Sequence, residues 1–106
     1  MGNNESMALT EAVYYILLAL YEPMHGYGIM QKIEDISCGR VKLAAGTLYG
    51  AINTLLDKDW IQALPDSNSS RKKEYIITER GKQVVASELK RLHELVLNGE
   101  AIIGGV

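Results

Sequence analysis

The stretch GTLYGAINTLL, residues 46–56, decides how the rest of the chain is interpreted. Its leucine and isoleucine residues recur at helical spacing and predict a helix with one buried stripe: Leu48, Ile52, Leu55 and Leu56. The residues off that stripe are small, aromatic or amide-bearing: Thr47, Tyr49, Gly50, Asn53 and Thr54. A helix that is only solvated usually carries charged residues on its outer face. We therefore expect this outer face to contact a partner.

Two further helices are predicted before this stretch. The first extends over residues 9–20 and ends before Pro23, because the residue that precedes a proline is disfavoured in a helix. A turn is expected at residues 25–26. A second helix then follows over about residues 27–37, with Gly39 in the position favoured just past a helix end.

A β-hairpin and a last helix are predicted after it. Strands are expected over residues 60–64 and 73–78, joined by a loop rich in turn-forming residues. Thr78 is suited to cap a helix that continues to about Asn98. Three helices, a hairpin and a helix predict an α+β, mostly α fold. This order is typical of a winged helix-turn-helix with an added C-terminal helix.

The predicted organisation is one compact unit. The winged helix-turn-helix occupies residues 7–80, and the C-terminal helix, residues 79–98, is expected to serve in dimerisation. Residues 1–6 and 99–106 are predicted to be flexible tails. A chain of 106 residues has room for one domain, and it gains a larger core by pairing with a second copy.

Composition excludes several classes of protein. The chain is 47% hydrophobic and 23% charged, as in an ordinary soluble protein, and it has no apolar run long enough to cross a membrane. A single cysteine, Cys38, excludes an internal disulfide and a paired-cysteine zinc site, and it favours a reduced, cytoplasmic setting. His25 and His93 show no ligand spacing, and no phosphate loop or nucleophile motif is present. The sequence thus predicts no enzyme, no metal and no cofactor.

Positive charge is concentrated in one part of the chain. The net charge is −2, yet residues 67–82 carry five Lys or Arg and only two acidic residues. Screening removes the influence of charges farther away than about 10 Å, so a local basic patch matters more to a polyanion than the total. The acidic total therefore does not exclude nucleic acid.

Three segments resemble motifs of the PadR-like family of transcriptional regulators. PMHGY, residues 23–27, resembles the turn into the second helix of that family. Residues 46–56 resemble its recognition helix, and RKKEYIITERG, residues 71–81, resembles its basic wing strand and the following helix start. The three motifs occur in order, and the resemblance extends from Leu9 to about Leu97.

The resemblance implies a function. Members of the family are mostly homodimeric repressors of efflux, detoxification and stress genes. Their C-terminal helix forms the dimer, and some release DNA when a phenolic or planar aromatic effector binds near the dimer interface. A dimer that sets two recognition helices about one DNA turn apart predicts an imperfect palindrome as the operator in double-stranded DNA. The alternative, suggested by the acidic total and by Glu74, is a protein-interaction module on the same fold without DNA binding.

The candidate DNA contacts lie in three segments: Tyr27, Thr47, Tyr49, Asn53, Ser70, Arg71, Lys72, Lys73 and Tyr75. Three consecutive cations on a hairpin suit phosphate contacts or minor-groove insertion, although most such runs are solvated turns. Asparagine pairs with adenine, and Tyr49 shares a helix face with Asn53. Structural alternatives are a capping role for Thr47, half-burial of Tyr49 and a turn that packs His25 and Tyr27.

The candidate dimerisation residues are mainly on the last helix: Tyr14, Val84, Leu89, Leu92, Leu95 and Val96. Tyr15 and Trp60 are the candidates for an effector site, and burial in the core is the alternative for Trp60. Four departures from the family pattern occur. Gly50 stands where proline is common, and Asp59 where a helix-ending glycine is common. Glu74 stands where an aromatic residue is common, and Ser69 and Ser70 where a Gly-Arg pair is common.

Overall fold

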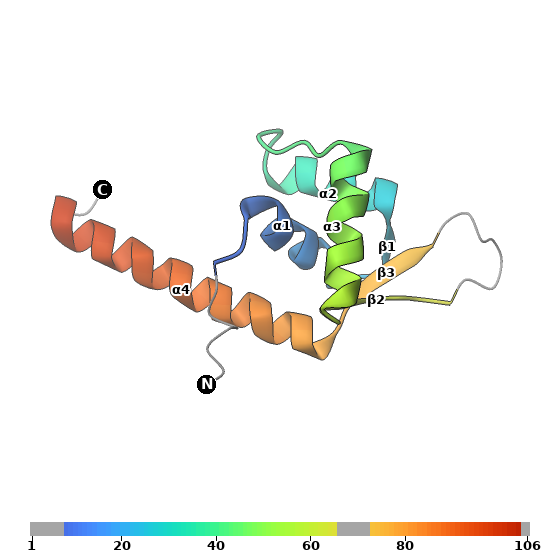
Figure 1. Cartoon of the computed structure of the whole chain (residues 1–106). Coiled ribbons are helices and arrows are strands. Elements are labelled where there is room, and N and C mark those ends of the chain that lie inside the picture. Colours follow the sequence, from blue (N-terminus) through green and yellow to red (C-terminus); the bar gives the residue numbers. More distant parts are fainter. Residues whose placement is uncertain (1–7, 66–72, 105–106) are drawn as a thin grey trace.

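The computed structural model describes residues 8–65 and 73–104. In chain order its elements are α1 (Glu11–Ala19), β1 (Met24–His25), α2 (Gly26–Ile36), α3 (Ala45–Asp57), β2 (Ile61–Ala63), β3 (Glu74–Ile77) and α4 (Glu79–Ile103). Figure 1 shows α1, α2 and α3 gathered into a body, with the sheet beside them and α4 running out of it. The predicted fold class is confirmed. Within the described ranges, no helix is both long and apolar enough to span a membrane.

A third strand enlarges the predicted hairpin. The strand order is β1-β3-β2, and both pairings are antiparallel, with Met24 opposite Tyr75 and Ile61 opposite Ile77. The turn predicted at residues 25–26 was therefore wrong. His25 closes β1 and caps α2, because its Nδ1 accepts a hydrogen bond from the Gly28 amide at 3.3 Å. The sheet thus connects the start of α2 directly to the wing strand.

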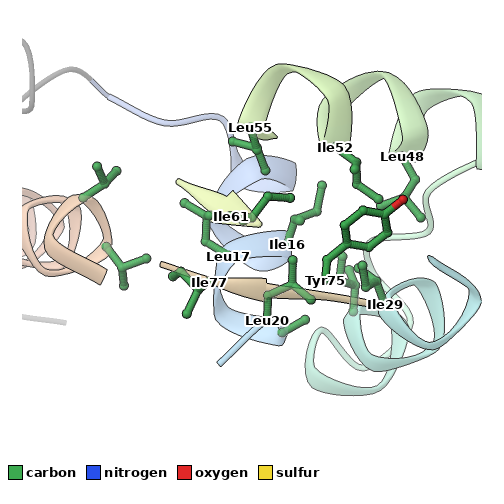
Figure 2. Close-up of a cluster of buried hydrophobic side chains, with 14 residues drawn as sticks. Ile16, Leu17, Leu20, Ile29, Leu48, Ile52, Leu55, Ile61, Tyr75 and Ile77 are labelled. Carbon is green, nitrogen blue, oxygen red and sulfur yellow. The ribbon is translucent and has the colours of Figure 1, made fainter. Parts of the chain in front are cut away.

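The core lies between the three helices, the sheet and the first turns of α4. Its fully buried side chains come from α1 and the residue that caps it, α2, α3 and β2: Ile16, Leu17, Leu20, Ile29, Ile33, Leu48, Ile52, Leu55 and Ile61. Figure 2 shows Tyr75 and Ile77 of β3 pointing into the same cluster. A tertiary hydrogen bond of 2.8 Å from the Ile77 amide to the Leu20 carbonyl joins the end of α1 to the sheet. The core therefore holds α3 and the wing strand in fixed relation.

Two non-glycine residues adopt the left-handed backbone conformation. Cys38 follows α2 with φ 55°, just before Gly39, and Asp59 follows α3 with φ 64°. Asp59 is the position where the family commonly has glycine, and the strain is borne here by an aspartate. The Asp59 carbonyl accepts a 2.7 Å hydrogen bond from the hydroxyl of Thr78, which also caps α4. This contact ties the end of α3 to the start of α4.

Helix α4 is longer than predicted. It continues through Gly99 to Ile103 and ends at Gly104, which has φ 90° and donates its amide to the Glu100 carbonyl. The prediction of a flexible tail from residue 99 was wrong for residues 99–103. An isolated glycine is tolerated inside a helix, and the apolar residues after it continue the pattern.

Candidate nucleic-acid interface

The two faces of α3 divide as its sequence predicts. Leu48, Ile52 and Leu55 are buried, with at most 1% of each side chain exposed. The off-stripe residues are all exposed: Thr47, Tyr49, Gly50, Asn53 and Thr54. Figure 2 shows the buried face of α3 directed at α1 and the sheet. The opposite face is therefore available to a ligand.

Thr47 does not cap α3. The N-cap is Ala44, which makes no side-chain hydrogen bond, and Thr47 lies inside the first turn. The first amides of a helix lack partners within the helix, so the start of α3 offers hydrogen-bond donors to an anion. The structural alternative for Thr47 was thus wrong, and its side chain is exposed in the first turn of the helix.

Tyr49 is both exposed and structural. Its side chain is 45% exposed. Its ring also packs against Gly26 so closely that a Cβ on Gly26 would overlap the hydroxyl and lie 2.6 Å from Cζ. This contact explains why glycine stands at the start of α2. The residue therefore holds the two helices together while half of it faces solvent.

The structure at the start of α2 distinguishes a structural role from a candidate DNA contact for His25 and Tyr27. His25 is structural, because it caps the helix. Tyr27 is 66% exposed in the first turn of α2, close in sequence to Gly26, where the Tyr49 hydroxyl packs. Tyr27 is thus accessible to solvent, and its contact with a phosphate stays a prediction.

The prediction that Tyr75 contacts DNA was wrong. Only 8% of it is exposed, and Figure 2 shows its ring within the buried cluster. Alternation along β3 places Tyr75 and Ile77 on the inner face, because successive strand residues point to opposite sides. Burial raises the pKa of the Tyr75 hydroxyl, and the nearby Tyr49 raises it further. Its side chain supports α3 and α2 from below and is not available to DNA.

The basic segment is smaller than the charge count suggested. Lys73 is exposed at the start of β3, while Ser70, Arg71 and Lys72 lie outside the described residues. Lys82 belongs to α4, where it pairs with Glu79 at 3.6 Å and lies over the Tyr21 ring. Arg80 also belongs to α4, so Lys73 is the one cation of residues 67–82 that the described part of the chain places at the wing strand.

The dimerisation candidates fall into two groups. Leu89, Leu95 and Val96 are more than half exposed on α4, and Leu92 is half-buried. Val84 is 3% exposed because it packs into the core of its own chain, so its assignment to the dimer interface was wrong. Three further apolar residues of the same helix are exposed and were not predicted as dimer contacts: Leu97, Ile102 and Ile103. For Ile102 and Ile103 the available signal was the apolar pair after Gly99.

A groove of about 340 Å³ lies between α1 and α4. It is lined by Leu9, Thr10, Glu11, Tyr14, Tyr15, Glu88, Arg91 and Leu92. Tyr15 therefore lies at a cavity, as an effector site needs. Trp60 does not line this groove. It packs at the edge of the core, with the Lys58 ammonium 5.2 Å from its ring. The structure does not bring the two effector candidates together.

These features define a class of protein. Three helices, a three-stranded antiparallel wing sheet and an exposed outer face on α3 make a winged helix-turn-helix, in which the third helix is the recognition helix. The model of the PadR-like transcriptional regulator family matches residues 15–87, and the chain belongs to this family. It is a DNA-binding transcriptional regulator and not an enzyme.

Solved structures agree on the fold. A PadR family transcriptional regulator from Eggerthella lenta DSM 2243 is 24% identical, with a TM-score of 0.74 over 87% of this chain and 80% of that one. A PadR family regulator from Clostridium difficile R20291 is 21% identical, with a TM-score of 0.74 over 90% and 100%. A transcriptional regulator from Clostridium thermocellum is 17% identical, with a TM-score of 0.73 over 88% and 92%. No curated protein matches the chain.

Proposed function

We propose that the chain acts as a homodimeric repressor that binds a palindromic operator in double-stranded DNA and controls efflux, detoxification or stress genes. Family membership supports the DNA-binding part of this proposal. The observation that carries the dimer is the exposed apolar surface on the C-terminal half of α4. A regulator of this kind works where DNA is, and we place it in the cytoplasm.

The spacing of apolar residues on α4 supports helix pairing. Leu89, Leu92, Val96 and Ile103 follow the alternating three- and four-residue spacing of a coiled-coil seam, with Gly99 filling one position. Val96, Gly99 and Ile103 lie beyond the part of α4 that packs on the body. Leu89 is 55% exposed, and Leu92 is half-buried at the groove between α1 and α4. Large exposed apolar surfaces of this kind mark protein interaction sites. Two copies of the seam packed together would remove it from water.

The DNA-binding mode follows from the exposed residues. In the proposed complex α3 enters the major groove, and Thr47 and Asn53 face base edges or adjacent phosphates. Tyr27 and the wing cations at residues 71–73 lie on the flanking backbone or in the minor groove. Two-fold symmetry would set the two recognition helices about 34 Å apart, one turn of DNA.

The test is a fluorescence anisotropy titration against two DNA fragments of equal length. One fragment comes from immediately upstream of the gene that encodes this chain, and the other is unrelated. We expect the upstream fragment to bind at least about 100-fold more tightly at moderate salt. Equal, salt-sensitive binding to both fragments would leave only the electrostatic attraction. Failure to bind at low salt, with the dimer confirmed, would instead favour the interaction module.

Two variants separate base reading from phosphate contact. Asn53→Ala should relax the preference at one base pair by about 1–3 kcal/mol, and Gln83→Ala, another exposed helical amide but on α4, should not. Arg71→Ala combined with Lys73→Ala should weaken binding to all sequences and reduce the salt dependence. Unchanged binding of the double variant at two salt concentrations would remove the wing assignment.

The groove between α1 and α4 is the candidate effector site. Tyr14 and Tyr15 offer aromatic surface to a small planar molecule, and Glu11 of the same groove pairs with Arg40 in the connection before α3. A molecule in the groove thus has a route to the recognition helix. A phenolic acid such as 4-hydroxycinnamate should release the DNA from the wild type. Tyr15→Ala should abolish that release, whereas Trp60→Phe should not.

A further inference from the structure

Glu88 is a charged group buried in the middle of α4. It is 4% exposed, and among the described residues only Ser37 joins it as a buried polar residue. Its carboxylate accepts three hydrogen bonds from two partners. The Arg91 guanidinium donates from Nε to Oε1 at 2.8 Å and from Nη2 to Oε2 at 2.7 Å. The backbone amide of Leu9 donates to Oε2 at 3.3 Å.

Burial of the Glu88 carboxylate, whose partner Arg91 remains 30% exposed, is not explained by stability alone. Removal of a charge from water costs free energy, and a well-packed apolar pair of similar volume is often as stable as an ion pair or more stable. The surroundings are apolar enough for such a pair, since Leu9, Tyr14 and Leu92 lie around the same groove. What the charged group adds is a fixed orientation of the groups that it joins. A bidentate guanidinium contact and a backbone hydrogen bond are both geometrically specific.

The position of Glu88 decides which two segments its hydrogen bonds hold in a fixed orientation. It is the last buried residue of α4, and beyond it the helix is half-buried at Arg91 and Leu92 and exposed from residue 93 onward. Leu9 immediately precedes Thr10, which caps α1. The carboxylate therefore links the start of α1 to α4 where α4 leaves the body, as the course of both helices in Figure 1 indicates.

We propose that Glu88 is a positioning residue, which fixes the angle at which α4 leaves the winged-helix body. The proposal rests on the homodimer proposed above, in which α4 joins the two bodies. Half-sites about 34 Å apart place each recognition helix about 17 Å from the dimer axis. A change in the α4 exit angle that turns each body by about 10° about the dimer axis would then move each recognition helix by about 3 Å, close to one nucleotide step. Glu88 thereby selects the operator half-site spacing.

The distance between the two bodies can be measured with a native label. Cys38 is the single cysteine of the chain, it is exposed, and it lies at the end of α2, far in sequence from α4. A spin label on Cys38 allows double electron–electron resonance across the intact dimer. Glu88→Gln keeps the size of the side chain and one carbonyl acceptor but removes the charge. Glu94→Gln, exposed on the same helix, is the matched control.

We expect one narrow distance distribution for the wild type and for Glu94→Gln. Glu88→Gln should broaden the distribution at least twofold or shift it by 3 Å or more, with the dimer retained in sedimentation. Arg91→Lys keeps the positive charge but loses the bidentate contact, and it should broaden the distribution less. This milder variant keeps the test valid if Glu88→Gln unfolds.

Binding to operators with altered spacing provides the functional readout. The wild type should prefer one half-site spacing over spacings one base pair longer or shorter by at least tenfold, and Glu88→Gln should reduce that preference to threefold or less. A general loss of stability would weaken binding to all spacings equally and would overturn the proposal, as would an unchanged distance distribution. A monomeric wild type would overturn the homodimer itself, and the positioning role with it.

Discussion

The two halves of α4 differ in whether their own chain buries their side chains. In the first half Gly81, Val84, Val85 and Glu88 are buried against the body of their own chain. In the second half Leu92 is half-buried, the large apolar side chains from residue 95 onward are exposed, and Ile102 reaches 85%. The helix is continuous across the change, so local propensity does not separate the halves. The difference shows that the first half is determined by the fold of one chain, whereas the second half has an apolar surface that only a partner would bury.

The largest expected effect is the loss of stability caused by a substitution in the first half of α4. Gly81→Ala would place a Cβ in overlap with the Trp60 carbonyl oxygen and 2.7 Å from Ile77 Cγ1. Backbone cannot move aside as a flexible side chain does, so we expect a loss of at least about 3 kcal/mol in the free energy of unfolding. Urea denaturation at fixed protein concentration measures it. A loss below about 1 kcal/mol would show that α4 can shift on the body.

The next largest effect is a loss of dimer affinity caused by a substitution in the second half of α4, which leaves the fold of the single chain unchanged. Val96→Asp introduces a charge in the proposed seam and should raise the dimer dissociation constant at least 100-fold, or about 2.7 kcal/mol. Leu97→Asp is the matched control, because the two side chains are 54% and 53% exposed but Leu97 lies outside the seam. Its dissociation constant should change less than threefold in sedimentation equilibrium. Equal effects of the two variants on the dissociation constant would show that the dimer does not use the proposed seam.

A third, smaller effect concerns the boundary between the halves. The Arg91 guanidinium, and to a lesser degree the Leu9 amide, hold the pKa of the Glu88 carboxyl below its ordinary value of 4.5, although burial alone would raise it. The unfolded chain therefore binds the proton more readily. The stabilising contribution is fully present above the unfolded pKa and is lost as the pH falls through the folded pKa.

Acid unfolding of the wild type and of Glu88→Gln measures this contribution. The stability difference between the two proteins should be constant near neutral pH and should shrink as the pH falls below about 4.5. Glu94→Gln should follow the wild type throughout. A difference that is independent of pH would mean that the carboxylate has the same pKa in the folded and unfolded chains.

Much of the fold could be predicted because it depends on local periodicity. The stripe through Leu48, Ile52 and Leu55 predicts α3 and its outer face, and both are observed. Strand β1 could not be predicted, since two residues have no period and its pairing partner is Tyr75, about fifty positions away. The end of α4 was misplaced because Gly99 resembles a stop signal, whereas Gly104 has the left-handed conformation.

The candidate site was harder to predict because accessibility depends on tertiary packing. The sequence placed Tyr75 and Ile77 on one strand face but did not reveal that this face is the inner one. Tyr49 has two roles only because α2 begins beside it. Glu88 carries an ordinary (i, i+3) pairing with Arg91, and its burial depends on Leu9, at the other end of the chain. Contacts between distant segments leave no local signature.

The smallest expected effect sharpens the comparison, because it repeats the first substitution in the other half of α4. Nothing lies within 4 Å of a Cβ built on Gly99. Alanine is favoured over glycine inside a helix by about 1 kcal/mol, so Gly99→Ala should raise the stability by about 0.5–1 kcal/mol in urea denaturation. Glycine at position 81 is then required by the body, whereas glycine at position 99 is not required by its own chain. A loss of stability that grows with protein concentration would instead show that the backbone of a second copy approaches Gly99, and it would place the closest contact of the dimer there.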